Sequence, residues 1–160
     1  MDILFLDAED YGPPEDRKWM EDTTDWWALG SQYWAKNPHK VNYSARFGIL
    51  LDMVGAPHAT FRTEAFSMQY APWVVKNVWN IAGKIGFSDY FLFEPGGAIT
   101  DDHVAINKIM NIPTIDIIHL VKDSSFYHTW HTTGDNLKSI DKTTLDVVGK
   151  TLMAVIASEK

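Results

Sequence analysis

The sequence predicts an α/β domain whose functional residues gather at one edge of a sheet. Three short apolar segments have the composition of buried strands, and each ends in or near carboxylate or histidine side chains. Segments with helical periodicity lie between them, an order that is typical of α/β folds. Because open α/β sheets form their sites at the carboxyl ends of the strands, the polar residues there are the first candidates for function.

The first predicted strand, residues 3–6, runs directly into a group of acids. Asp7, Glu9 and Asp10 follow within four positions, and a turn rich in Gly and Pro comes next. In an extended chain Glu9 and Asp10 point to opposite faces, so that one can bind a cation while the other faces a substrate. The alternative interpretation is a solvated strand end that runs into a turn.

A polar loop over residues 11–25 and then a helix follow the first strand. The loop contains Trp19, and long loops in compact domains tend to be functional or mobile. Because Trp19 is surrounded by charged residues, it is the better pocket candidate, with Trp27 as a rival. Aromatic residues then recur near helical spacing, with Gly30 and Ser31 at the predicted start of the helix.

The second predicted strand, residues 47–55, carries Asp52 near its carboxyl end. A buried Asp is costly unless it is paired, hydrogen-bonded or bound to a metal, so Asp52 needs a partner if it lies inside the fold. The alternative is a cap or turn acid just past the strand. Residues 64–84 then predict one long amphipathic helix with a kink at Pro72, and residues 90–93 predict a short strand.

The motif Ile99-Thr100-Asp101-Asp102-His103 precedes apolar residues at helical spacing. Thr100 is the expected helix cap, and Asp101 and Asp102 complement the positive end of the helix dipole. This structural explanation is complete, but helix amino termini also lie where sheet edges form sites. His103 is a candidate hydrogen-bond donor to a carboxylate.

The third predicted strand, residues 112–118, leads through an aromatic loop to a final helix capped by Asp141. Of the six histidines, His131 is favoured as a ligand because it lies in a Trp-His-Thr sequence within that loop. Asp10 and His131 are a candidate ligand pair for zinc, which accepts imidazole and carboxylate donors. Because catalytic zinc sites have three protein ligands, a third ligand, expected to be an Asp, would come from outside this chain.

Composition narrows the class of protein further. The 160 residues carry a net charge of −7 without a basic cluster, which argues against a nucleic-acid partner. The lack of cysteine excludes disulfides and thiolate metal sites, and no apolar segment approaches membrane-spanning length. The size predicts one catalytic domain over residues 1–160. Its start, one residue before an apolar strand, predicts that it is the carboxyl-terminal part of a longer domain.

Five motifs, taken in order, resemble the zinc-dependent glutaminyl cyclases of animal type and their bacterial relatives, which belong to the zinc exopeptidase structural class. The motifs are Leu6-Asp7-Ala8-Glu9-Asp10, Gly30-Ser31-Gln32, Leu51-Asp52-Met53-Val54-Gly55-Ala56-Pro57, Thr100-Asp101-Asp102-His103, and Trp130-His131-Thr132 with Asp135-Asn136. The resemblance covers nearly all 160 residues, as the carboxyl-terminal part of the family domain. It implies a three-layer fold in which helices flank a central mixed, mostly parallel sheet, without the amino-terminal strands of that sheet.

The resemblance also implies the chemistry. It makes Asp10 and His131 ligands of one Zn²⁺, although the family often has Glu at the position of Asp10, and it makes Glu9 the proton shuttle. The implied reaction converts the amino-terminal glutamine of a peptide or protein to pyroglutamate and releases ammonia. Related bacterial enzymes are generally exported, which implies a periplasmic or exported protein. The supporting acids would be Asp52 and Asp101, and the substrate pocket would be lined by Trp130, Trp19, Ile99 and Phe126.

Two other functions are compatible with the same residues. In a zinc aminopeptidase of this structural class, Glu9 would activate a metal-bound water and Asp52 would bind a second zinc ion. Trp130, and an acid at Asp101 where such aminopeptidases often have Ser, favour the cyclase. The other alternative is a non-catalytic fragment or binding module that keeps the acids of the fold without a complete metal site.

Overall fold

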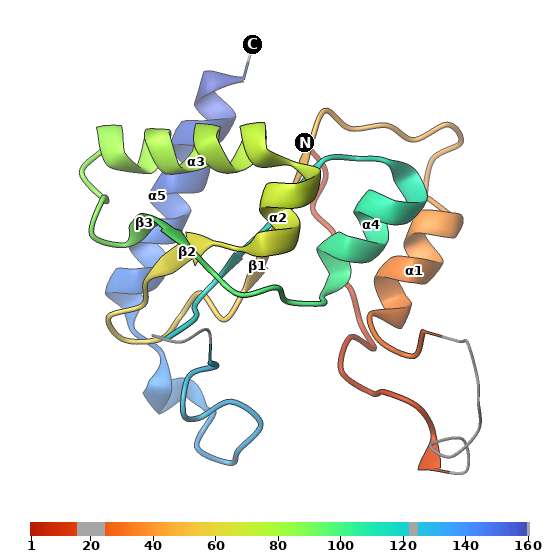
Figure 1. The fold of residues 1–160 in the computed structure, drawn as a ribbon, viewed down its shortest axis with the longest axis horizontal. Helices are drawn as coiled ribbons and strands as arrows, with labels where there is room; N and C mark the ends of the chain where they lie inside the picture. The colour runs from red at the N-terminus through yellow and green to blue at the C-terminus, as the bar shows by residue number, and fades with distance from the viewer. Residues whose placement is uncertain (16–24, 122–124, 160) are drawn as a thin grey trace.

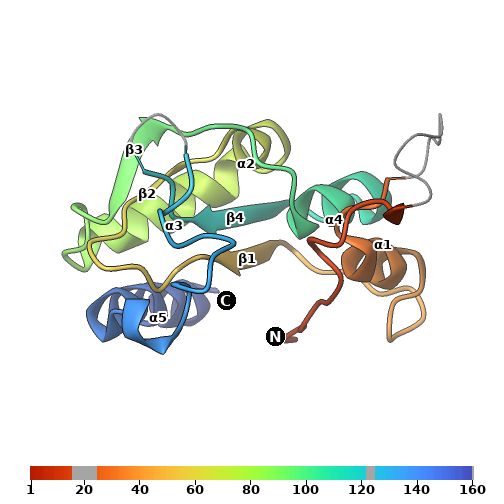
Figure 2. The ribbon, with the colours of Figure 1, turned by 90° about the horizontal axis from the view of Figure 1, so that it is seen from below.

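A computed structural model describes residues 1–15, 25–121 and 125–159. In Figure 2 the pair of strands β1 and β4 lies in the middle, with α5 on one side, α2 on the other, and α1 and α4 at one end. The predicted α/β fold, with parallel strands between helices, is confirmed. The elements in chain order are α1 (Leu29–Lys36), β1 (Gly48–Asp52), β2 (Phe61–Thr63), α2 (Ala65–Tyr70), α3 (Pro72–Lys84), β3 (Phe91–Pro95), α4 (Asp102–Met110), β4 (Thr114–Ile118), the 3₁₀-helix η3 (Leu137–Ser139) and α5 (Lys142–Ser158).

The described strands form two parallel pairs. In the first pair β1 lies beside β4, with Gly48 opposite Thr114 and Asp52 opposite Ile118. In the second pair β2 lies beside β3 with an irregular register, and one antiparallel bridge between Phe61 and His119 links the two pairs. All five residues of β4 are buried, as expected for a parallel strand that is covered on both faces.

The hydrophobic core lies where α3 packs against the strands and α5. Its largest buried side chain, Trp79 of α3, is 1% exposed, and its indole N–H donates to the carbonyls of Phe61 and Leu92 at 3.2 and 3.1 Å. Because Phe61 is in β2 and Leu92 is in β3, this one side chain fixes both strands against the helix. Other core residues are Val74, Val75, Val78, Phe91, Ile115, Ile117, Val148 and Val155.

The single long helix predicted over residues 64–84 is wrong, because the structure has two helices there. Ala71 leaves the helical region, with φ −139° and ψ 49°, and Pro72 begins α3 as its first residue. Proline has no N–H to donate within a helix but is well suited to a first helical turn. It therefore starts a new helix where a kink was expected.

The strand predicted over residues 3–6 is not formed. Ile3 and Phe5 are 70% and 96% exposed, and within the described residues no strand pairs with this segment. An apolar composition favours a strand only where a neighbour can accept its backbone hydrogen bonds. The predictions also missed β2, which is too short to show a periodicity, and they ended β3 two residues early.

Of the two predicted helix caps, the one at α5 is confirmed and the one at α4 is wrong. Asp141 caps α5 as predicted, because its carboxylate accepts the N–H of Thr143 at 2.8 Å. The cap of α4 is not Thr100 but Asp101, which accepts the N–H of Asp102 at 2.5 Å. No helix among the described residues is both long enough and apolar enough to cross a membrane.

Replacing Asp141 by Ala should lower the free energy of unfolding by about 1 kcal/mol, because the first turn of α5 loses its cap. Urea denaturation measures this loss. Asp146→Ala is the control in the same helix, since Asp146 makes only an exposed pair with Lys150 and its removal should cost less than about 0.5 kcal/mol. Equal losses for the two variants would contradict the capping role.

Candidate active site

Segments that are far apart in the sequence meet at one edge of the fold. In Figure 1 these segments lie in the lower half of the view, as the red chain of the first residues, the lower end of α4 and the loop before α5. Asp52, the last residue of β1, belongs to the same edge, because the charges of Asp101 and Asp10 act on its carboxyl group. The site is therefore built on the carboxyl end of a strand and the amino end of a helix, as the sequence predicts.

The start of α1 anchors the acidic segment at residues 7–9. The N–H groups of residues 28, 29 and 30 donate to the carbonyls of residues 9, 8 and 7 at 2.8, 3.0 and 3.1 Å. Gly30 permits this approach, because a Cβ there would lie 2.3 Å from the carbonyl oxygen of Asp7. Ala8 takes a left-handed conformation with φ 51°, so the chain is not extended. The prediction that Glu9 and Asp10 point to opposite faces of an extended chain therefore fails, and the charge of Asp10 contributes to the raised pKa of Glu9.

Asp10 and His131 lie in direct contact, although 121 positions separate them in the sequence. Nε2 of His131 lies 3.0 Å from Oδ2 of Asp10, and each side chain is about half exposed. The ring of Trp130 stacks on that of His131, with centroids 3.8 Å apart and an interplanar angle of 17°. Phe126 stacks on Trp130 in turn, at 4.3 Å and 25°. The structure thus brings together the two predicted ligands and two of the predicted pocket residues.

The other pocket candidates are placed less directly. Ile99 is partly buried in the segment that leads into α4, two residues before Asp101. Trp19 lies outside the described residues. Its rival Trp27 packs over Gly12, where a Cβ would lie 3.1 Å from the indole ring. A cavity of about 60 Å³ lies next to Trp130, and Met53, Tyr127 and Ile140 are among its other lining residues.

Burial and mutual repulsion shift the pKa values of the acids at this edge. Burial, together with the charges of Asp101 and Asp10, raises the pKa of Glu9 to about 8. Burial and the charge of Asp101 raise the pKa of Asp52 to about 6, against a backbone hydrogen bond from Met53. Burial also raises the pKa of Asp101, although the N–H of Asp102 partly offsets the effect. A carboxyl group with a pKa near 8 can gain and lose a proton close to neutral pH.

Sequence reasoning missed two buried acids next to this edge, Asp116 and Glu64. Asp116 of β4 is 1% exposed, and neither of its carboxyl oxygens has a hydrogen-bond partner among the described residues. Burial, with the charges of Asp101 and Asp52, raises the pKa of Asp116 well above its usual value. Its signal in the sequence is an acid between two isoleucines of an apolar strand. Glu64 gives no such signal, since Glu is not a preferred cap residue.

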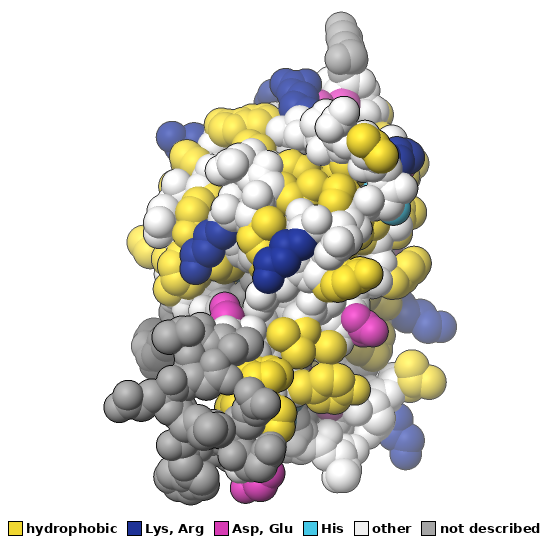
Figure 3. All heavy atoms as spheres, turned by 90° about the vertical axis from the view of Figure 1, so that its right-hand side faces the viewer, with side chains coloured by type: hydrophobic (Ala, Val, Ile, Leu, Met, Phe, Trp, Pro, Cys, Tyr) yellow, Lys and Arg dark blue, Asp and Glu magenta, His cyan; other side chains and the backbone are white. Residues whose placement is uncertain are grey.

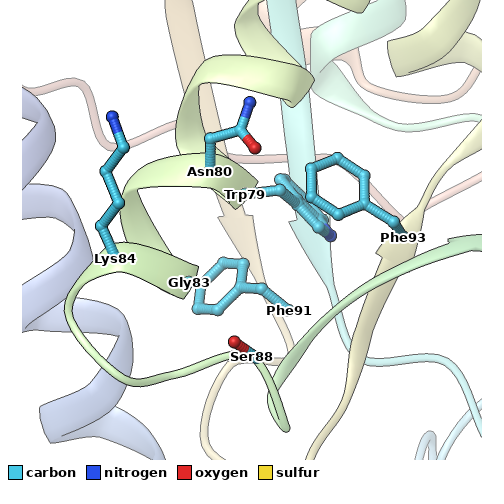
Figure 4. Close-up of a pocket in the computed structure, with 7 residues that line it drawn as sticks. All are labelled: Trp79, Asn80, Gly83, Lys84, Ser88, Phe91 and Phe93. Atoms are coloured by element: carbon cyan, nitrogen blue, oxygen red, sulfur yellow. The ribbon is translucent and has the colours of Figure 1, made fainter.

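A second cavity lies away from the predicted site residues. It has a volume of about 340 Å³ and opens between α3 and β3, where Trp79, Phe91 and Phe93 present their rings beside Lys84 and Ser88 (Figure 4). None of its lining residues is an acid or a histidine. The candidate site therefore rests on the acidic edge and not on this cavity.

The face on the side of α1 and α4 has a different character from the acidic edge. Figure 3 shows hydrophobic side chains on this face, interspersed with Lys or Arg and few acids. Exposed apolar residues of these helices include Tyr33, which is 70% exposed, and Ile109, which is 36% exposed. Beneath that surface, Ser31 of α1 is buried and its hydroxyl donates to the carbonyl of Ala28 at 2.9 Å.

The fold and the arrangement of the site define an α/β protein of the zinc exopeptidase class. A glutaminyl cyclase from Bacteroides thetaiotaomicron, bound to N-acetylhistamine, matches with TM-score 0.89 and 49% identity, over 98% of this chain and 53% of that chain. A Zn-dependent exopeptidase from Parabacteroides distasonis ATCC 8503 matches with TM-score 0.87 and 47% identity, over 97% of this chain and 53% of that chain.

Residues 1–156 match the profile of peptidase family M28, and the chain belongs to this family. The glutaminyl-peptide cyclotransferase of Bos taurus is 30% identical over 118 residues, which are 68% of this chain and 31% of the bovine protein. The chain thus spans about half the length of the two matched structures and about a third of the bovine relative. The predicted resemblance is confirmed for family and fold, and these relatives indicate an enzyme.

Asp10 and His131 fit a zinc ion in donor type and in spacing. Oxygen and nitrogen ligands at about 2.0–2.2 Å from a tetrahedral ion lie roughly 3.3 Å from each other, close to the observed separation of 3.0 Å. Within the part of the chain that the structure describes, no group of three acid or histidine side chains could hold a metal ion. A catalytic zinc site uses three protein ligands, so the pair offers two donors of the right type and lacks a third among the described residues.

Asp116→Asn should make the protein relatively more stable as pH rises. A raised pKa in the folded state means that Asp116 favours folding most below its unfolded pKa, near 4, and that this contribution is lost as pH increases toward the folded pKa. Asn cannot ionise, so the variant should gain free energy of unfolding relative to the parent as pH rises above about 4. The gain should be about 1.4 kcal/mol for each pH unit that lies between the unfolded and the folded pKa.

Urea denaturation across this pH range measures that difference. Asp89→Asn, at an exposed position before β3, is the control and should show a difference that does not change with pH. A parallel pH dependence for Asp116→Asn and the parent would mean that Asp116 ionises freely in the folded protein.

Proposed function

We propose that this chain forms part of the active site of a glutaminyl-peptide cyclotransferase, which converts amino-terminal glutamine to pyroglutamate and releases ammonia. The observation that supports this most strongly is the contact between Asp10 and His131, beside a carboxyl group, Glu9, whose pKa is raised to about 8. The similarity to the Bacteroides thetaiotaomicron glutaminyl cyclase and to the bovine cyclotransferase supports the same reaction.

The reaction forms one C–N bond and breaks another. The α-amino nitrogen attacks the side-chain amide carbon of the same glutamine, and the amide nitrogen leaves as ammonia with the proton that the α-amino group loses. Glu9 would accept this proton and pass it to the leaving nitrogen, and a pKa of about 8 allows both transfers near neutral pH. The charge of Asp101 contributes to this proton affinity, which is the supporting role proposed for it.

Zinc is the proposed cofactor, with one ion per site and with Asp10 and His131 as two of its ligands. When bound, it would supply Lewis acidity toward the side-chain carbonyl of the substrate. Trp130 keeps the imidazole plane of His131 fixed through its stacking contact. Together with Phe126 and Ile99, it would form an apolar wall that holds the glutamyl side chain in a conformation suited to ring closure.

The proposed substrate is a peptide or protein that begins with glutamine, and the proposed location is the periplasm or the outside of the cell. The substrate follows from the named relatives. The location follows only from the resemblance to exported bacterial enzymes, and fractionation of the producing cells would test it.

Similarity to a Zn-dependent exopeptidase supports a second candidate, the removal of the first residue from peptides. Glu9 would then act on a water molecule in place of an α-amino group. A peptide that begins with leucine separates the two candidates, because leucine has no side-chain amide to attack. Release of free leucine would support the exopeptidase, whereas an unchanged leucine peptide together with loss of ammonia from a glutamine-initiated peptide would support the cyclotransferase.

Glu9→Gln should keep its zinc but lower kcat for a glutamine-initiated peptide by at least about 100-fold, because an amide cannot shuttle the proton. A coupled ammonia assay at saturating peptide measures kcat, and elemental analysis measures zinc. Glu94→Gln is the matched control, since Glu94 is an exposed acid on β3 that pairs with Arg62. A kcat equal to that of the parent in Glu9→Gln would exclude Glu9 from the proton transfer.

His131→Ala should lose the bound zinc, because the site keeps only Asp10 among the two ligands of this chain. His128→Ala, at an exposed position of the same loop, should retain the zinc content of the parent. Elemental analysis after dialysis against metal-free buffer measures both variants. Equal zinc content in the two variants would contradict the ligand assignment.

A further inference from the structure

We propose that Glu64 is a positioning residue that holds Ile99 and Asp101 in the active site. This inference rests on the proposed function, because that function is what makes Ile99 and Asp101 active-site residues. The contacts of Glu64 do not depend on the proposed function. Glu64 is the residue before α2 and is fully buried, with 0% exposure. No other role described above uses it, and an acid is not expected at such a position unless its oxygens are occupied.

Both carboxylate oxygens of Glu64 are occupied. Oε1 accepts the N–H of Phe66 at 2.8 Å and the N–H of Ile99 at 3.0 Å. Oε2 accepts the N–H of Ser67 at 2.5 Å and lies 3.2 Å from Nε2 of His103. Because an ionised carboxylate can only accept, the imidazole of His103 must donate in this contact. One buried side chain therefore joins the start of α2, the segment before α4 and the first turn of α4.

The four hydrogen bonds are strong enough to keep the carboxylate charged inside the fold. Burial alone would raise the pKa of Glu64, but the hydrogen bonds from His103 and from the N–H groups of Ile99, Ser67 and Phe66 outweigh it and lower the pKa to about 2. Hydrogen bonds to charged groups stabilise more than neutral ones do. The contact should therefore persist throughout the pH range in which the protein is folded.

The segment that Glu64 binds carries the residues proposed for the pocket and the proton transfer. Residues 96–97 already follow the chain at residues 63–65, through backbone hydrogen bonds of 2.9 and 3.0 Å. Beyond them, residues 98–100 have no regular secondary structure. Glu64 accepts a hydrogen bond from Ile99 in this stretch and contacts His103 in α4. Asp101 lies between these two residues in the sequence. Without Glu64, the position of Asp101 would depend on the helix start alone.

Amide hydrogen exchange in the unmodified chain tests the contact directly. The N–H of Ile99 lies outside regular structure, so it should exchange rapidly unless Glu64 protects it. We expect an exchange rate at least about tenfold slower than that of a free peptide, and the same protection at pH 5 and pH 7. Exchange at the free-peptide rate would overturn the proposal without any variant being made, and it would say nothing against the proposed reaction.

Glu64→Gln then tests whether the contact serves the site. The amide keeps one acceptor oxygen, and whichever way it is turned its NH₂ group faces N–H donors that it cannot accept, so the side chain should be displaced and the exchange of Ile99 should accelerate at least about tenfold. With a glutamine-initiated peptide, kcat/KM should fall at least about tenfold at saturating zinc, because the pocket residue and the acid shift.

Asp141→Asn is the matched control, because Asp141 is the acidic cap of a helix whose cap lies outside these contacts. Asn keeps an oxygen that can accept the N–H of Thr143 but loses the charge that favours the amino end of α5, so the melting temperature should fall slightly. The exchange of Ile99 and kcat/KM should stay within about twofold of the parent. Equal losses of kcat/KM in the two variants would mean that Glu64 acts only as a helix cap, and this would overturn the proposal. If the unmodified chain shows slow exchange of the Ile99 N–H but no cyclisation of the peptide, the result would count against the proposed function and not against the contact of Glu64.

Discussion

The gathering of carboxyl groups at one partly buried edge is the constraint on which this structure depends. Glu9, Asp52 and Asp101 all have raised pKa values, because Asp101 is buried, Glu9 and Asp52 are partly buried, and each lies in the field of other acids at this edge. Local structure offsets part of the repulsion through the N–H of Asp102 and the positive end of α4. The remaining negative potential favours either protonated acids or a bound cation, and both are what a metal-assisted proton transfer requires.

Strained backbone is found in the segments that carry these groups. Ala8, Met53 and His131 take left-handed φ values of 51°, 51° and 54°, although none of them is glycine. Ala8 precedes Glu9, Met53 follows Asp52, and His131 is itself a proposed ligand. Such strain persists only where surrounding contacts hold the backbone in that conformation. The N–H groups at the start of α1 and the ring of Trp130 provide such contacts. The geometry of the site is thus set more by these neighbouring backbone and ring contacts than by the acids themselves.

Patterns of residues predicted the class of fold, most of the helices and the pairing of Asp10 with His131, because these depend on periodicity and on motif order. The strand at residues 3–6 failed, since strand formation depends on a neighbour that composition does not reveal. Glu64 was invisible because its partners lie 2 to 39 positions away and three of them are backbone groups. Asp116 was visible only as an acid within an apolar strand. Buried acids such as these depend on tertiary contacts between distant segments, and the residues next to them in the sequence do not reveal those contacts.

The measurement that tests the assignment most directly is the intact mass of one glutamine-initiated peptide after incubation with the zinc-loaded protein. A product that has lost one ammonia and kept its first residue is the result expected of a cyclotransferase. A product shortened by its first residue would contradict that assignment and support the exopeptidase. An unchanged peptide would mean that the acids of this edge do not form a working site in this chain.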